Sequence, residues 1–161
     1  MIVRPSAFSD LPRILEIYAR AREFMRLSGN PTQWGDDRPR ELAVRDDIER
    51  GVSCIVEAEG NAVGVFAFII GDEPTYRKID GRWLNDAPYG TVHRIASSGE
   101  VGGVFSACLE FCFSRMPNIR IDTHRDNAPM RHLLRKHGFA ECGTIWVDDG
   151  TPRIAFQKFQ E

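Results

Sequence analysis

Apolar residues recur every three or four positions in four stretches of the chain, and this spacing predicts four helices. The first helix begins behind Asp10, its expected N-cap, and ends before Gly29. In the second helix we expect Leu42 and Ile48 to face inward. The predicted helices begin near residues 11, 39, 104 and 128.

Between the helices, β-branched and apolar runs predict strands. These runs cover residues 2–4, 52–57, 62–70, 91–97, 118–123, 139–147 and 153–159. Two hairpins join neighbouring runs across Gly60 and across Gly150. This order of elements predicts an α/β (α+β) layer arrangement, in which a mixed sheet packs against helices.

Two segments between the predicted elements are irregular. One is a short polar loop that carries Trp34, and the other, residues 71–89, is rich in large side chains. A long loop with aromatic residues in a compact domain is more often functional than decorative. We therefore expect Trp34, Tyr76 and Trp83 to line a binding pocket. Glu73, Asp80 and Asp86 could select an amine, although isolated carboxylates of this kind are more often surface charges. For the aromatic residues the alternative is packing of the loop onto the sheet.

The strand over residues 91–97 leads into a turn that carries Gly102 and Gly103, and the helix from Val104 follows at once. A strand, a glycine-bearing turn and a helix in this order leave free backbone N–H groups at a helix N-terminus. Such groups, together with the positive end of the helix dipole, bind phosphate. The sequence therefore predicts a pyrophosphate site at this turn.

Three segments carry a resemblance to a known family: Ile95-Ala96-Ser97, the turn from Glu100 to Phe105, and the stretch from Asp126-Asn127 to Gly138-Phe139. They resemble the GNAT superfamily of N-acetyltransferases, and the resemblance covers nearly the whole chain. It implies one GNAT-like domain over residues 1–161, with a mostly antiparallel central sheet flanked by helices. It also implies acetyl-CoA (coenzyme A) as cofactor. The implied reaction is acetyl transfer to a primary amine of a small molecule or an amino terminus, by direct attack in a ternary complex.

The resemblance further implies roles for individual residues. In that family the central strand pairs with the pantetheine arm of coenzyme A, the glycine turn holds the pyrophosphate, and an Asn with its helix lines the cofactor from the other side. Carried over by position, the pantetheine contacts are Ile95, Ala96 and Ser97, the pyrophosphate cradle is Val101, Gly102, Gly103, Val104, Phe105 and Ser106, and the second wall is Asn127 with Arg131.

Three residues depart from the family's pattern. Glu100 stands where Arg or Gln usually opens the turn, and Phe105 takes the place of the second glycine. We expect repulsion of an anion from the first and a partly filled phosphate groove from the second. The consequence is either weaker cofactor binding or positive charge supplied by another segment of the chain. Leu134 replaces the tyrosine that often serves as general acid. These departures keep an alternative open, a non-catalytic acyl-CoA-binding or regulatory module of the same fold.

Two histidines are candidate general bases, since an alkylamine with a pKa near ~10 must lose a proton before it attacks. His93 lies on the predicted central strand, on the face that carries an acidic base in some members of the family. His124 follows the next strand, where alternation permits a pair with Asp122. The alternatives are a histidine satisfied within the sheet for His93 and a capping residue for His124.

Net charge and composition limit the kinds of molecule that we expect the chain to bind. With a net charge of −2 and a pI near 6.1, the chain has no basic field that would indicate nucleic acid or an anionic membrane. No run has the length of a membrane span and the N-terminus lacks a signal-peptide pattern, so we expect a cytoplasmic protein. The four cysteines include no Cys-x-x-Cys pair, and we expect reduced core thiols and no metal site. A homodimer through a sheet edge would suit such a domain.

Overall fold

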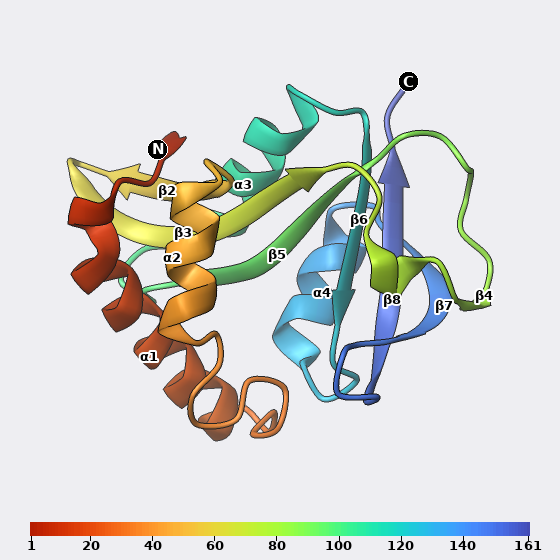
Figure 1. Cartoon of the computed structure of the whole chain (residues 1–161), viewed down its shortest axis with the longest axis horizontal. Helices are drawn as coiled ribbons and strands as arrows, with labels where there is room; N and C mark the ends of the chain where they lie inside the picture. Colours follow the sequence, from red (N-terminus) through yellow and green to blue (C-terminus); the bar gives the residue numbers. More distant parts are fainter.

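The computed structural model describes residues 1–161 and contains an eight-stranded sheet flanked by four helices (Figure 1). The strand order is β1-β2-β3-β5-β6-β8-β7-β4. The strands are β1 (Ile2–Pro5), β2 (Ser53–Ala58), β3 (Asn61–Ile70), β4 (Asp80–Gly81), β5 (Gly90–Ser97), β6 (Asn118–Thr123), β7 (Ala140–Trp146) and β8 (Pro152–Phe159). The helices are α1 (Leu11–Leu27), α2 (Glu41–Glu49), α3 (Val104–Phe113) and α4 (Ala128–Lys136). The predicted mixed, mostly antiparallel sheet with flanking helices is confirmed. The short strand β4 was not predicted.

The strands β5 and β6 are the only parallel neighbours in the sheet, and they pair only at the start of each strand. The paired positions are Gly90 with Ile119 and Thr91 with Arg120. Beyond these residues the two strands diverge, as Figure 1 shows. Ligands of open sheets bind at the carboxyl ends of strands, where the chain leaves in different directions. The divergence therefore creates a cleft in the middle of the sheet.

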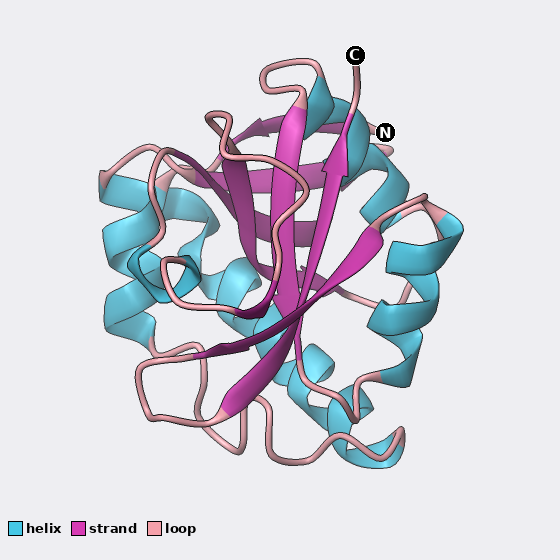
Figure 2. Cartoon of the chain, turned by 90° about the vertical axis from the view of Figure 1, so that its right-hand side faces the viewer, coloured by secondary structure: helices cyan, strands magenta, loops and turns pink.

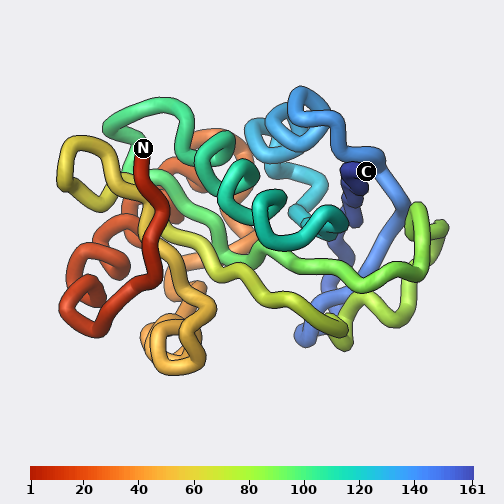
Figure 3. The backbone as a smooth tube through the Cα atoms, turned by 90° about the horizontal axis from the view of Figure 1, so that it is seen from above, coloured from red at the N-terminus to blue at the C-terminus, as the bar shows by residue number.

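Helices cover both faces of the sheet (Figure 2), and α2 and α3 lie on opposite sides of it (Figure 3). The core under α3 and α4 includes Phe66, Cys108, Leu134 and Phe156. The core under α1 and α2 includes Ile14, Val44, Ile55 and Val65. None of the four helices combines the length and the apolar character that crossing a membrane requires. Each helix instead buries one stripe of side chains against the sheet.

The 71–89 loop joins β3 and β5 and forms a third, smaller core. Its apolar side chains pack on β7 and β8, and the cluster is formed by Tyr76, Tyr89, Ile145 and Ala155, with Ile79, Trp83 and Val147 beside it. The loop contains a 3-10 turn, Pro74–Tyr76, and the strand β4, which pairs with β7. A segment that lacked helical or strand periodicity is therefore held in place by its own aromatic residues.

Asp10 stands at the predicted N-cap position of α1, but its side chain makes no capping hydrogen bond to that helix. Asp10 ends a 3-10 turn, Phe8–Asp10, and this turn runs directly into α1, so the residue already has helical dihedral angles. Its carboxylate accepts hydrogen bonds from the backbone N–H of Ala7 at 2.7 Å and from the guanidinium of Arg4 at 2.8 Å. The side chain thus faces back toward β1 rather than the first turn of α1.

The predicted inward position of Leu42 is also wrong, because this side chain is 81% exposed. The buried face of α2 is set by Val44 and Ile48, which stand one helical turn apart. Asp47 is buried on the same helix, where it pairs with Arg94 of β5. A polar residue therefore takes an inward position that the apolar pattern alone assigned differently.

Candidate functional site

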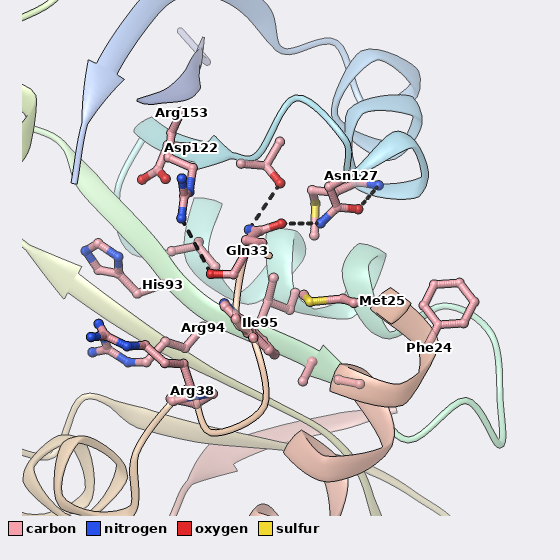
Figure 4. Close-up of a pocket in the computed structure, with 18 of the residues that line it drawn as sticks. Phe24, Met25, Gln33, Arg38, His93, Arg94, Ile95, Asp122, Asn127 and Arg153 are labelled. Atoms are coloured by element: carbon pink, nitrogen blue, oxygen red, sulfur yellow. Dashed lines mark hydrogen bonds between the residues drawn. The ribbon is translucent and has the colours of Figure 1, made fainter. Parts of the chain in front are cut away.

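A cavity of about 770 Å³ occupies the cleft between the diverging ends of β5 and β6 (Figure 4). Its walls come from α1, the 28–40 loop that joins α1 and α2, the strands β5 and β6, the start of α4 and the turn between β7 and β8. These segments are far apart in the sequence, so only the folded chain assembles the cavity.

The wall formed by β5 offers unpaired backbone. Beyond Thr91 the edge of β5 toward β6 has no partner strand. A bulge also interrupts the pairing of β5 with β3, because Arg94 and Ile95 together stand opposite one residue of β3. Arg94 has a φ of +54°, in the left-handed region that non-glycine residues adopt only when the surroundings enforce it.

Contacts from α1 and α2 hold the bulge. The hydroxyl of Tyr18 donates to the carbonyl of Arg94 at 2.8 Å. The guanidinium of Arg94 donates to both carboxylate oxygens of Asp47, at 2.8 and 2.7 Å. Such a two-point bond to a buried carboxylate fixes the orientation of the arginine as well as its position. The backbone conformation of the bulge is therefore fixed by contacts from both helices.

The turn before α3 presents a row of unpaired amides. The backbone N–H groups of residues 101–106 donate to no acceptor in the protein, and the first hydrogen bond of α3 joins Ala107 N–H to the carbonyl of Gly103 at 3.0 Å. Gly103 is the N-cap and has a φ of +89°, which a glycine adopts without strain. This geometry suits a phosphate group, because the amides and the helix dipole point the same way.

Neither of the two expected obstacles occupies this turn. Glu100 forms salt bridges with Arg13 at 2.6 Å and with Arg20 at 2.9 Å, so two cations of α1 neutralise its charge. The side chain of Phe105 is buried in the core under α3 and packs edge-on against His137, with 5.3 Å between ring centroids. Positive charge beside Glu100 is thus supplied by another segment, α1, as one of the two alternatives required. The expectation that the ring of Phe105 lies in the groove is wrong, because the ring is packed in the core.

His93 lines the cavity and meets a carboxylate from the 71–89 loop. Its Nε2 lies 3.4 Å from Oε2 of Glu73, and both side chains are about four-fifths buried. The hydroxyl of Thr75 donates to Oε1 of Glu73 at 2.9 Å. The contact with His93 is the main cause that lowers the pKa of Glu73 to about 2. Glu73 thus holds the imidazole at the cavity wall as a charged partner.

Asp122 also lines the cavity, next to His93 and Arg153 (Figure 4). Its Oδ2 accepts a hydrogen bond from the hydroxyl of Tyr76 at 2.6 Å. Burial raises the pKa of Asp122, and the hydrogen bond from the tyrosine hydroxyl and the nearby side chains of His93 and Arg153 act in the opposite direction. A carboxyl group in such a setting can accept a proton nearer to neutral pH than a solvated one.

His124, the second predicted base, lies outside the lining of the cavity. Its Nδ1 accepts a hydrogen bond from the backbone N–H of Asp126 at 3.0 Å, and its Nε2 lies 3.5 Å from the hydroxyl of Thr32. Burial is the main cause that lowers its pKa. The structure does not pair it with Asp122, and the geometry is that of a residue that stabilises the turn before α4.

The three aromatic residues expected at an acceptor pocket separate into two groups. Trp34 lines the cavity and packs edge-on against Tyr18, with 5.6 Å between ring centroids. Tyr76 and Trp83 lie outside the lining and pack on each other at 5.1 Å. The guanidinium of Arg120 lies 4.1 Å from the ring centroid of Trp83. These two rings fix the 71–89 loop to the sheet.

The opposite wall begins at the N-terminus of α4. Asn127 caps this helix by accepting from the N–H of Met130 at 3.1 Å, and its amide donates to Oε1 of Gln33 at 3.0 Å. Arg131 donates to the carbonyl of Arg125 at 2.9 Å, whereas its Nε is buried without an acceptor. Of the residues carried over by resemblance, Ile95, Ala96, Ser97 and Asn127 line the cavity.

Three residues of the cavity wall escaped the sequence-based predictions as binding groups: Gln33, Asp122 and Arg153. Gln33 lies in a polar loop with no motif. Asp122 and Arg153 lie in apolar strand runs, and a charge inside a buried strand is the signal that could have found them. No group of three or more His, Cys, Asp or Glu side chains is placed to hold a metal ion.

No protein-family profile and no curated protein matches the chain. Among solved structures, the chain is similar to a GNAT-family acetyltransferase from Streptococcus agalactiae, with 30% identity and a TM-score of 0.90 over 99% of this chain and 95% of that chain. A GNAT-family acetyltransferase from Listeria monocytogenes is 22% identical, with a TM-score of 0.72 over 99% of this chain and 94% of that one. A ribosomal-protein-alanine N-acetyltransferase from Brucella melitensis is 18% identical, with a TM-score of 0.65 over 99% and 100%. The last two similarities concern the fold alone.

Proposed function

Because the chain belongs to the GNAT family of acetyltransferases, we propose that it is an N-acetyltransferase that moves an acetyl group from acetyl-CoA to a primary amine. The amine belongs to a small molecule or an amino terminus and attacks directly within a ternary complex. The observation that carries this proposal is the order of three features along β5 and the turn that follows it: His93 at the cavity wall, the unpaired edge of the strand, and the unpaired amides before α3.

The chain supplies matching groups along the length of coenzyme A. The amides of residues 101–106 are suited to the pyrophosphate, and the edge of β5 around Ile95 and Ser97 is suited to the amide groups of the pantetheine arm. Asn127 stands on the other wall, and Arg131, whose buried Nε lacks an acceptor, lies one turn further along α4, outside the cavity lining. Acetyl-CoA supplies a thioester carbonyl carbon, to which the amine nitrogen bonds as the carbon–sulfur bond breaks and the thiol leaves.

His93 is the proposed general base. When Nε2–H donates to Glu73, the Nδ1 of the neutral imidazole carries the lone pair that takes a proton from the amine, directly or through one water. The carboxylate of Glu73 then stabilises the imidazolium that forms. A histidine whose second nitrogen is oriented by a carboxylate is a recurrent arrangement for proton transfer.

A backbone N–H on the unpaired edge of β5 is the proposed donor to the oxyanion that develops on the carbonyl oxygen. The bulge at Arg94 sets the direction of this edge, and Tyr18 and Asp47 hold the bulge in place. Because these supports are present before any ligand binds, the donor needs no reorganisation at the moment of reaction. Preorganised donors of this kind are worth about 10²–10³ in rate.

The leaving thiol needs little help from the protein. Leu134, at the position of the family's tyrosine, is fully buried and serves the core under α4. A thiol has a pKa near ~8.5, so its thiolate leaves readily and takes a proton from water. The proposal therefore assigns no side chain as general acid.

A thermal-shift titration tests the cofactor first. Coenzyme A and acetyl-CoA are expected to raise the unfolding midpoint, by about 2.7 kcal/mol of stabilisation at a hundredfold excess over Kd, whereas ATP as control is not. A thiol-release assay with a panel of primary amines then tests transfer. If coenzyme A binds and no amine releases thiol, the chain is the alternative, an acyl-CoA-binding module. If coenzyme A does not bind, the proposal is wrong.

A further inference from the structure

Arg153 brings a positive charge into the cavity wall without an acidic partner. The residue is 8% exposed, lines the cavity and forms no salt bridge. Its Nη1 donates to the hydroxyl of Thr151 at 3.0 Å and to the carbonyl of Pro152 at 2.8 Å. Its Nη2 makes one weak contact, with the carbonyl of Gln33 at 3.5 Å, and its Nε donates to no acceptor. A buried cation in this state lacks the counter-charge that burial normally requires.

The edge formed by Nε and Nη2 is therefore the open part of the guanidinium. Two parallel N–H groups match the two oxygens of a carboxylate, and this geometry distinguishes arginine from lysine as an anion-binding residue. Asp122 and Asp149 are near enough to act on the charge of Arg153, and burial still lowers its pKa. Neither carboxylate makes a salt bridge with Arg153.

The other arginines of the cavity wall do not share this state. Arg38 also lacks a carboxylate partner, and it is exposed to solvent, which compensates its charge. The remaining ones are paired: Arg20 with Glu16 and Glu100, Arg40 with Asp37, and Arg94 with Asp47. Arg153 is thus the buried cation of the wall whose partner is missing.

The side chains that could face the amine of an acceptor, Asp122 and His93, lie on the same cavity wall as Arg153. Asp122 pairs in register with Ala155, and Arg153 lies two residues before Ala155, so Asp122 and Arg153 are diagonal neighbours on one face of the sheet. Figure 4 shows Arg153, Asp122 and His93 together on one side of the cavity. A ligand that carries an amine and a carboxylate on the same carbon atom complements this set of charges.

The open edge of Arg153 is not positioned to bind a phosphate of the coenzyme. Ile154 and Phe156 of β8 pack toward the core under α3 and α4, whereas Arg153 alternates with them and points to the opposite face. The unpaired amides proposed for the pyrophosphate lie before α3, which packs on the first face. The coenzyme phosphates and Arg153 are therefore on different sides of the sheet.

From these observations we infer that the acceptor is a free amino acid, whose α-carboxylate binds the Nε–Nη2 edge of Arg153 while its amine faces Asp122 and His93. This inference rests on the proposed function and adds the substrate class. It disfavours a peptide amino terminus as acceptor, because there the α-carboxyl group is an uncharged amide. Arg153 acts as a specificity-determining residue in this account.

Matched acceptors test the inference. Thiol release is measured with each of several α-amino acids, with the corresponding carboxamide, with the decarboxylated amine and with a dipeptide that begins with the same residue. The wild-type protein is expected to prefer the free amino acid by about 10- to 100-fold in kcat/KM, as for the loss of a charged hydrogen-bond pair. In Arg153→Gln this preference is expected to fall to about one. Arg153→Lys keeps the charge without the edge and should retain only a small part of it.

Arg45→Gln provides the matched control, because Arg45 is an exposed arginine of α2 outside the cavity. It should retain the full preference. A second readout does not need turnover: N-acetyl amino acids should raise the unfolding midpoint of the wild-type protein more than N-acetyl amino acid amides do, and Arg153→Gln should abolish the difference. If the substitution prevents folding, the wild-type comparison of acid with amide still decides.

Two results would overturn the inference: a wild-type protein that uses the amide, the amine or the dipeptide as well as the free acid, or an Arg153→Gln protein that keeps the preference for the acid. Failure of the proposed function looks different, since no acceptor then releases thiol. In that case the thermal shifts with N-acetyl amino acids and their amides still test whether Arg153 binds a carboxylate.

Discussion

The two long loops of this molecule relate to the sheet in opposite ways. The 71–89 loop buries Tyr76 and Tyr89 on β7 and β8, packs the half-buried Trp83 beside them, and becomes part of the framework. The 28–40 loop carries mainly polar side chains, lines the cavity and has one aromatic residue, Trp34. Burial of apolar side chains holds a loop in one position, whereas a polar loop is held only by its hydrogen bonds.

Polar contacts complete the attachment of the 71–89 loop. The buried Gln157 accepts from the N–H of Leu84 at 2.8 Å, and Asn118 donates to Oδ1 of Asn85 at 2.9 Å. Arg120 donates to the carbonyl of Asn85 at 2.9 Å. This fixed loop in turn places Glu73 and Tyr76 against the cavity residues His93 and Asp122, so it serves the site as a support.

The 28–40 loop is linked to the opposite side of the cleft mainly by the side chain of Gln33. Oε1 of Gln33 accepts from Asn30 at 2.8 Å and from Asn127 at 3.0 Å, and Nε2 lies 3.4 Å from the hydroxyl of Thr123. Few of its side chains are buried. Regions with few buried apolar contacts open most easily, and ligand-binding segments are drawn from them. We therefore expect this loop to respond to ligands and the 71–89 loop to stay fixed.

The largest expected effect on stability comes from the framework loop. Tyr76→Ala removes a fully buried ring and the hydroxyl that Asp122 accepts from, and should lower the free energy of unfolding by about 3–5 kcal/mol. Urea denaturation measures this change. Trp34→Ala, the aromatic substitution in the other loop, should lower it by less than half as much. Equal losses for the two variants would show that the loops do not differ in the way described.

The next largest effect separates the two candidate bases. His93→Gln should lower kcat/KM by roughly 100-fold, as expected for loss of a general base, with little change in the unfolding midpoint. His124→Gln, outside the cavity lining, should change kcat/KM by less than about threefold, since it removes no group at the reacting atoms. Steady-state thiol release measures both. A larger loss for His124→Gln would transfer the role of base to that residue.

The support that Glu73 provides should also be visible in acid. The pKa of Glu73 is lowered from 4.5 to about 2 by its contact with His93, so its contribution is fully present above about pH 4.5 and disappears as the pH falls toward 2. Since solvent screens part of this interaction, we expect about 1–2 kcal/mol. Glu73→Gln should therefore lose less stability than the wild-type protein between pH 4.5 and pH 2. Parallel denaturation curves at several pH values check this, and identical acid profiles would contradict it.

The last comparison concerns two glutamines, one that anchors each loop. Gln157→Ala removes a fully buried amide that anchors the 71–89 loop and should lower the free energy of unfolding by about 1–3 kcal/mol. Gln33→Ala should cost at most about 1 kcal/mol and should instead raise KM for the acceptor about 3- to 10-fold. The pair is measured by denaturation and by thiol release. A rise of KM in Gln157→Ala alone would reverse the roles assigned to the loops.

The sequence predicted the elements of this fold because each helix and strand has its own periodicity. Strand neighbours that are distant in sequence, such as β6 beside β8, leave no such local signal. The cavity residues divide in the same way, into those with a local sequence signal and those without one. His93 and Ile95 were found because one strand and one turn carry the motif, whereas Gln33 and Arg153 enter the wall only through tertiary contacts. The aromatic residues of the 71–89 loop were ambiguous in sequence because packing and binding favour the same side chains.

Amide hydrogen exchange with and without coenzyme A is the decisive experiment for the cofactor site, because it reports on both loops and on the cleft at once. If coenzyme A binds as proposed, exchange slows at residues 101–106 and along the edge of β5, slows less in the 28–40 loop, and does not change in the 71–89 loop. Unchanged exchange at residues 101–106, or protection centred on the 71–89 loop, would contradict the assignment of the β5–β6 cleft as the acetyl-transfer site.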